Sequence, residues 1–183
     1  MKLTTDEVNV ILDEADCLFD DKQVQHALDK MAESISADLK NSNPLIIAVM
    51  SGAVIPTGHL LTRLSFPLEI DYVHATRYDG DIKGTKLKWI VEPRCSLKDR
   101  VIVIVDDILD EGYTLEAIIK YCYLKGAADV KTAVLVEKDH QRGVSVAVDY
   151  IGLTVPDRYV FGYGMDYKGF LRNANGIYAV KGL

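Results

Sequence analysis

Residues 101–114 read VIVIVDDILDEGYT, and this stretch decides the fold class. Its first five residues are all β-branched, which is typical of a central strand that is covered on both faces. Two adjacent carboxylates follow, Asp106 and Asp107, and then come Asp110 and a glycine turn at Gly112. The next apolar residues recur at helical spacing and predict a helix. A buried strand joined to a helix by a short polar turn predicts an α/β fold.

The rest of the chain repeats this alternation of strands and helices. Apolar residues within 8–19 and within 21–40 follow the helical period, and a third helix should begin near Pro56. Short apolar or alternating runs predict the other strands, at residues 45–49, 68–72, 130–136 and 150–153. We therefore expect one domain over residues 1–183, with a mostly parallel central sheet, flanking helices and right-handed crossovers.

The composition argues against several classes of protein. The net charge of -6 disfavours a general nucleic-acid binder, which usually carries a basic stripe. No apolar run approaches the ~18 residues that span a bilayer. Cys17, Cys95 and Cys122 are widely spaced and form no CxxC pair, which indicates reduced thiols. We expect a cytoplasmic protein that binds neither nucleic acid nor membranes. The four histidines show no metal-ligand spacing, and we assign them no role.

The three acids have two interpretations. A single Asp before a helix is usually an N-cap. Three acids at the end of a buried strand, beside Gly112 and Thr114, favour a ligand site, because open α/β sheets bind ligands at the carboxyl ends of their strands. Asp106 and Asp107 could accept hydrogen bonds from two vicinal ribose hydroxyls, and the helix N-terminus could bind a phosphate. The Walker pattern GxxxxGK[ST] is absent from the sequence.

This segment resembles the phosphoribosyl pyrophosphate motif of type I phosphoribosyltransferases, and residues 45–183 resemble the hypoxanthine-guanine phosphoribosyltransferases. The resemblance implies an enzyme that transfers the 5-phosphoribosyl group from phosphoribosyl pyrophosphate to hypoxanthine or guanine. IMP or GMP and pyrophosphate would be the products, and Mg²⁺ the cofactor. It also implies a small hood, built mainly from residues 150–183 with the N-terminus, and assembly as a homodimer or homotetramer.

The resemblance places the sugar donor at the motif. Asp106 and Asp107 would bind the ribose and, together with Asp166, Mg²⁺. Four consecutive residues would hold the 5-phosphate through backbone amides and one hydroxyl: Glu111, Gly112, Tyr113 and Thr114. Glu111 stands where the family has Thr or Ser, and we expect its carboxylate to point away from the phosphate.

Other segments would complete the donor site. Ser51 and Gly52 match the pyrophosphate-binding turn, where family members often keep a cis non-proline peptide, and Arg172 would also contact pyrophosphate. Thr76 and Tyr78 would open a polar, mobile lid that runs to Lys88 and shields the reacting sugar from water.

The base would lie against four further residues. Asp110 would act as the general base, or as a charge that stabilises the transition state. Lys138 would donate to the purine 6-oxo group, and Tyr159 would stack on the ring. The Val160 carbonyl would accept from the exocyclic amino group of guanine.

Two alternatives remain open. The same Lys138 would accept any 6-oxopurine, so the enzyme could prefer xanthine. A regulatory protein on this fold could instead bind phosphoribosyl pyrophosphate together with an operator or RNA, although the net charge of -6 argues against it.

Overall fold

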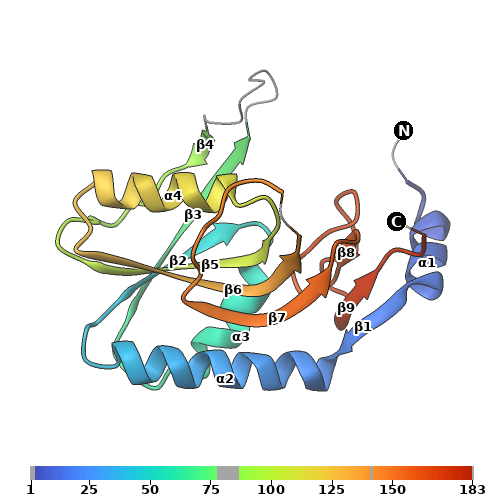
Figure 1. Ribbon diagram of the computed structural model, residues 1–183, viewed down its shortest axis with the longest axis horizontal. Helices are drawn as coiled ribbons and strands as arrows, with labels where there is room; N and C mark the ends of the chain where they lie inside the picture. Colours follow the sequence, from blue (N-terminus) through green and yellow to red (C-terminus); the bar gives the residue numbers. More distant parts are fainter. Residues whose placement is uncertain (1–2, 78–86, 141, 183) are drawn as a thin grey trace.

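The computed structural model describes residues 3–77, 87–140 and 142–182. Its centre is a six-stranded sheet in the order β4-β3-β2-β5-β6-β7 (Figure 1). The strands are β2 (Leu45–Met50), β3 (Glu69–Arg77), β4 (Leu87–Val91), β5 (Val101–Leu109), β6 (Asp129–Asp139) and β7 (Tyr150–Pro156). Every neighbouring pair is parallel except β3 and β4, which are antiparallel. This confirms the expected mostly parallel sheet.

Helices cover both faces of this sheet. On one face lie α2 (Asp21–Leu39) and α3 (Val54–Leu61), and on the other lies α4 (Tyr113–Leu124) (Figure 1). The unbroken apolar run of β5 follows from this layering, because successive side chains point to opposite faces. Val103 and Val105 pack with α2, whereas Ile102 and Ile104 pack with α4.

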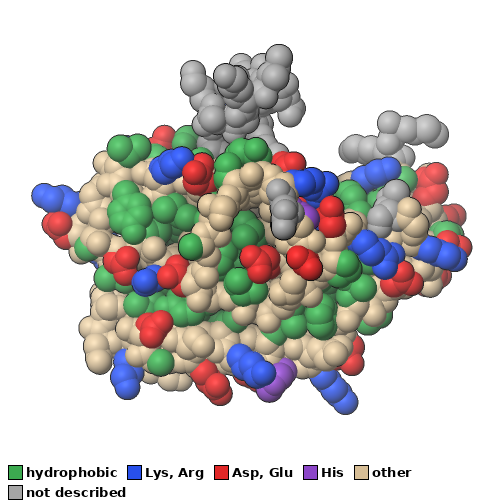
Figure 2. All heavy atoms as spheres, viewed as in Figure 1, with side chains coloured by type: hydrophobic (Ala, Val, Ile, Leu, Met, Phe, Trp, Pro, Cys, Tyr) green, Lys and Arg blue, Asp and Glu red, His purple; other side chains and the backbone are tan. Residues whose placement is uncertain are grey.

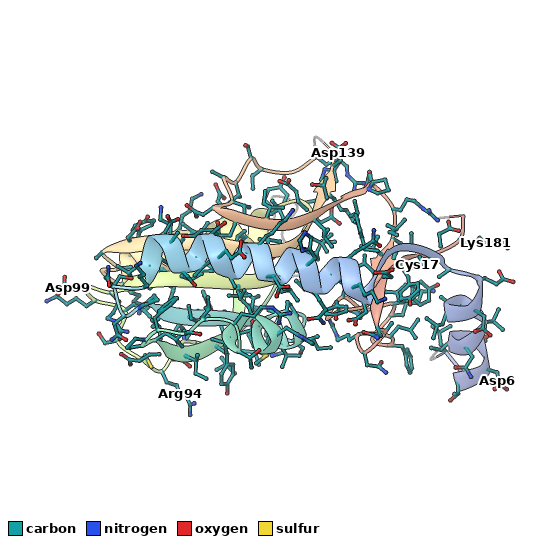
Figure 3. All side chains as sticks on the ribbon, turned by 90° about the horizontal axis from the view of Figure 1, so that it is seen from below. Asp6, Cys17, Arg94, Asp99, Asp139 and Lys181 are labelled. Atoms are coloured by element: carbon teal, nitrogen blue, oxygen red, sulfur yellow. The ribbon has the colours of Figure 1, made fainter. Side chains whose placement is uncertain are left out.

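A second, smaller sheet forms the hood. It joins β1 (Asp16–Asp20), β9 (Gly176–Ala179) and β8 (Val160–Phe161) in that order, with antiparallel pairing. The first helix, α1 (Thr5–Glu14), packs through Ile11 and Leu12 on a buried cluster around Phe161. Figure 3 shows α2 along the sheet, with Asp99 at one end of the molecule and Asp6 and Lys181 at the other, where the hood lies.

One local prediction is wrong, and one strand buries an unexpected side chain. Leu18 and Phe19 continue the helical spacing, yet α1 ends at Glu14 and both residues lie in β1, because this segment pairs with the distant β9. The alternation in 68–72 predicts a half-exposed strand, and in β3 Ile70 is 62% exposed while Asp71 is buried. The Asp71 carboxylate accepts three backbone N–H bonds at 2.7–2.8 Å, which compensates for its burial.

The charge distribution and the helices bear on the expected class of protein. Acidic and basic side chains are interspersed over the face shown in Figure 2. In the part of the chain that the structure describes, no helix combines the length and apolar character needed to cross a membrane.

Candidate active site

Two adjoining cavities open where the parallel strands end. The first, of about 310 Å³, is lined by the turn after β2, the end of β5 and the start of α4, with Asp166 and Arg172 from the hood side. The second, of about 270 Å³, lies between Lys138 and the hood residues Tyr159 and Val160. The two share four lining residues: Asp107, Ile108, Asp110 and Asp166. A ligand with two chemically different halves therefore has a continuous site here.

The first turn of α4 forms one wall of the larger cavity. Gly112 is the N-cap and has φ +79°, a left-handed conformation that glycine adopts without strain. A methyl group at Gly112 would lie 2.8 Å from the Val144 carbonyl oxygen, so the loop after β6 leaves no room for a side chain. The predicted residues Glu111, Gly112 and Thr114 line this wall, and Tyr113 begins the helix.

Asp106 and Asp107 lie inside β5 rather than after it. We expected these acids in the loop, but the ladder with β6 continues from Asp106 to Leu109. Burial raises the pKa of both carboxyls, and the charge of Asp107 raises the pKa of Asp106 further. Arg172 is the cation beside them, with Nη1 3.9 Å from an Asp107 oxygen.

The three predicted ligands, Asp106, Asp107 and Asp166, provide some but not all of the oxygen ligands that Mg²⁺ needs. Two partly buried, neighbouring carboxylates favour a cation, and carboxylate oxygen is the ligand that Mg²⁺ prefers. Asp166, the third predicted ligand, pairs with Arg172 at 2.5 Å and accepts from the Gly169 amide at 2.6 Å. Within the described ranges, no group of three or more potential ligands could hold a metal ion. The remaining ligands of a bound Mg²⁺ would have to be substrate oxygens and water.

The turn after β2 is held tightly between strand and hood. Its Met50–Ser51 peptide is cis, as the resemblance implied. A Cβ on Gly52 would lie 2.0 Å from an Asp107 oxygen, and a Cβ on Gly164 would lie 2.1 Å from the Gly52 carbonyl oxygen. Only a residue without a side chain fits at either position.

Asp110 is surrounded by cationic or N–H-donating side chains. Lys138 Nζ lies 2.8 Å from Oδ2, and His140 Nε2 lies 2.7 Å from Oδ1. Arg142 Nη2 is 3.5 Å from Oδ1. Partial burial raises the pKa of Asp110, but the hydrogen bonds from Lys138 and His140 outweigh it, so the pKa lies below its ordinary value. A carboxylate at this position is thus ionised at neutral pH.

The hood closes the smaller cavity. Tyr159 is 41% exposed and meets Tyr167 edge-on, with ring centroids 5.2 Å apart. Val160 is buried in β8. The exposed ring of Tyr159 is thus available to a planar ligand, and Val160 also lines this cavity.

Sequence reasoning missed one residue of this site, and two of its predictions are not described. His140 follows Lys138 by two residues, and side chains at this spacing in an extended strand share a face; this was the available signal. Thr76 lies in β3, but its side chain is outside the described residues, as is Tyr78 with the predicted lid up to residue 86.

The comparisons with known proteins agree with this architecture. Residues 14–168 match the phosphoribosyl transferase domain family, and the chain belongs to that family. More narrowly, it closely resembles the hypoxanthine-guanine phosphoribosyltransferases. It is 33% identical to that enzyme of Leishmania donovani over 177 residues, which cover 91% of this chain and 84% of the relative.

A solved structure and a longer relative extend the comparison. The hypoxanthine-guanine phosphoribosyltransferase of Bacillus anthracis superposes with a TM-score of 0.86 at 26% identity, over 90% of this chain and 98% of the other. The bifunctional protein TilS/HprT of Listeria innocua is 31% identical over 157 residues, or 85% of this chain. The match spans only 24% of that longer protein.

Proposed function

We propose that the protein transfers the 5-phosphoribosyl group from phosphoribosyl pyrophosphate to hypoxanthine or guanine. IMP or GMP and pyrophosphate are the products. The observation that carries this proposal is the pair of adjoining cavities: one is lined by a helix N-terminus and paired acids, and the other by a lysine and an exposed aromatic ring. Asp110 belongs to both, where the new bond between base and sugar would form.

The larger cavity would hold the sugar donor. The amides of 111–114 and the Thr114 hydroxyl bind the 5-phosphate at the positive end of the α4 dipole. Asp106 and Asp107 accept hydrogen bonds from the ribose hydroxyls. The turn at Ser51 and Gly52 and the guanidinium of Arg172 face the pyrophosphate, which gains negative charge as it leaves. A bound Mg²⁺ would neutralise part of that charge.

The smaller cavity would hold the base. Lys138 donates to the 6-oxo group, a choice that disfavours adenine because its 6-amino group would meet another donor. Tyr159 stacks on the ring, and the Val160 carbonyl accepts from the 2-amino group of guanine. Asp110 accepts the proton that the imidazole nitrogen loses as it attacks the anomeric carbon.

The direct test is pyrophosphate release from hypoxanthine, phosphoribosyl pyrophosphate and Mg²⁺. Asp110→Asn should keep the fold and lower kcat by ~10²–10⁴, the usual contribution of a general base. If the kcat of Asp110→Asn stays within about threefold of wild type, Asp110 is not the general base. Absence of product with the wild-type protein would remove the proposed reaction.

The assembly and location are also proposals. We propose a homodimer or homotetramer, supported by the exposed apolar side chains of Val54 and Ile70 at 49% and 62%. Light scattering after size exclusion measures this directly, and a monomer would refute it. The three free thiols suit the reducing cytoplasm.

A further inference from the structure

His140 follows the last residue of β6, and its ring lies against Asp110, beside the two cavities. Its side chain is only 7% exposed, and Nε2 is 2.7 Å from Asp110 Oδ1. The other ring nitrogen, Nδ1, accepts the backbone N–H of Arg142 at 3.0 Å. Because Nδ1 is occupied as an acceptor, the hydrogen of the ring is on Nε2. His140 therefore donates to Asp110, and the backbone of its own loop fixes both the tautomer and the ring orientation.

The other two partners of Asp110 are less permanent. Lys138 binds Oδ2, but the same ammonium is the proposed donor to the purine 6-oxo group, so base binding would draw it away. Arg142 is 55% exposed and pairs more closely with Asp157, at 2.6 Å, than with Asp110, at 3.5 Å. Of these three side chains, His140 is the most buried. Its ring is also held by a second hydrogen bond, from the backbone N–H of Arg142.

We propose that His140 is the positioning residue for Asp110. Its Nε2–H holds Oδ1 while Lys138 turns to the base, and Oδ2 is left facing the imidazole N–H of the purine. The proton passes from the base nitrogen to Asp110 Oδ2, and His140 keeps its own proton throughout. This inference rests on the proposed role of Asp110 as the base, and it extends the site by one residue.

The test compares three substitutions at His140 with a control. His140→Leu removes the donor, and His140→Asn keeps a polar side chain that is too short to reach Asp110. His140→Gln places an amide N–H close to the position of Nε2. His26→Leu changes an exposed histidine on α2 and serves as the matched control.

We expect the Leu and Asn variants to lose about 10–100-fold in kcat, since misplacing a reacting group by 1 Å can cost ~10²-fold. The KM for phosphoribosyl pyrophosphate should stay within about twofold, because the hydrogen bonds of His140 described above go to Asp110 and Arg142 rather than to residues 111–114. His140→Gln should recover kcat to within about fivefold of wild type, and His26→Leu should match wild type. Thermal unfolding checks that each variant is folded.

Two results would overturn the inference. One is a folded Leu or Asn variant with kcat within twofold of wild type. The other is an equal loss in the Gln, Leu and Asn variants, which would mean that the ring only fills space. If Asp110→Asn is inactive while the His140 variants are normal, only the positioning role fails. If Asp110→Asn is also normal, the proposed role of Asp110 fails with it.

Discussion

Gly52→Ala places a methyl group where the structure has no room for one. The new Cβ would lie 2.0 Å from one Asp107 oxygen, 2.4 Å from its Cγ and 2.7 Å from the other oxygen. Ordinary van der Waals contact begins near 3.4 Å, so the carboxylate must move by about 1.4 Å. Gly164 also packs closely on the carbonyl oxygen of Gly52, which limits how far the turn can shift.

The cost should appear in both binding and stability. A displacement of about 1 Å at a positioned group can lower a rate ~10²-fold, so kcat/KM for phosphoribosyl pyrophosphate should fall by about that factor. Overpacking a tight contact costs roughly 1–3 kcal/mol. In a domain of this size each kcal/mol shifts Tm by about 2–4 °C, so Tm should fall by roughly 2–12 °C.

The assay is steady-state kinetics with varied phosphoribosyl pyrophosphate, together with calorimetry. Gly58→Ala is the matched control: Gly58 lies in α3, and apart from its chain neighbours and the backbone of its own helix, no described heavy atom lies within 4 Å of the added Cβ. Alanine in a helix interior gains about 0.5–1 kcal/mol over glycine, so this variant should be slightly more stable and fully active. If Gly52→Ala keeps kcat/KM within about threefold and Tm within about 1 °C of wild type, half of the smallest shift expected, the contact with Asp107 is not as described.

Three other predictions follow from single residues. Lys138→Gln should lower kcat/KM for hypoxanthine by about 10–100-fold and leave the KM for phosphoribosyl pyrophosphate within threefold, because one charge-assisted donor contributes about 1.5–3 kcal/mol; loss of donor binding instead would contradict the assignment. Glu111→Thr should tighten phosphoribosyl pyrophosphate by about fivefold or less, because its carboxylate is expected to point away from the phosphate; a hundredfold gain would refute that orientation. Asp71→Asn should lower Tm at pH 7. Burial raises the pKa of Asp71, but backbone N–H bonds from Cys95, Tyr72 and Arg94 outweigh it, so the pKa is lowered. The stabilisation is therefore present above the ordinary pKa and is lost as pH falls through the lower pKa of the folded state. Calorimetry should find the Tm values of the two proteins converging as the pH falls below 3.8, the ordinary value for Asp. A Tm difference independent of pH would exclude this cause.

The sequence predicts the central strands β2 and β5 well because they are buried on both faces, whereas the edge strand β4 was not predicted. Residues 45–49 and 101–105 are unbroken apolar runs, and such runs have few structural interpretations. The hood was harder to predict, because β1 and β9 are short and lie about 160 residues apart in the chain. Leu18 and Phe19 continue the helical spacing of α1, and only their pairing with β9 makes them a strand.

Only part of the candidate site could be predicted from the sequence. The acids and the start of α4 are contiguous in the sequence, so their chemistry could be recognised directly. Contacts between distant segments could not be recognised, such as Gly52 against Asp107 or His140 against Asp110. These contacts depend on where the turn after β2 and the end of β6 meet β5, which is a property of the assembled sheet.

The central claim is that the paired cavities join a 6-oxopurine to a phosphoribosyl group, and base selectivity tests it most directly. The measurement is kcat/KM for hypoxanthine, guanine, xanthine and adenine with phosphoribosyl pyrophosphate and Mg²⁺. We predict that hypoxanthine or guanine exceeds adenine by at least about 10³-fold, because a site built around one hydrogen-bond donor rejects an analogue that lacks the acceptor by ~10⁴. Turnover of adenine equal to that of hypoxanthine, or no nucleotide from any 6-oxopurine, would contradict the account.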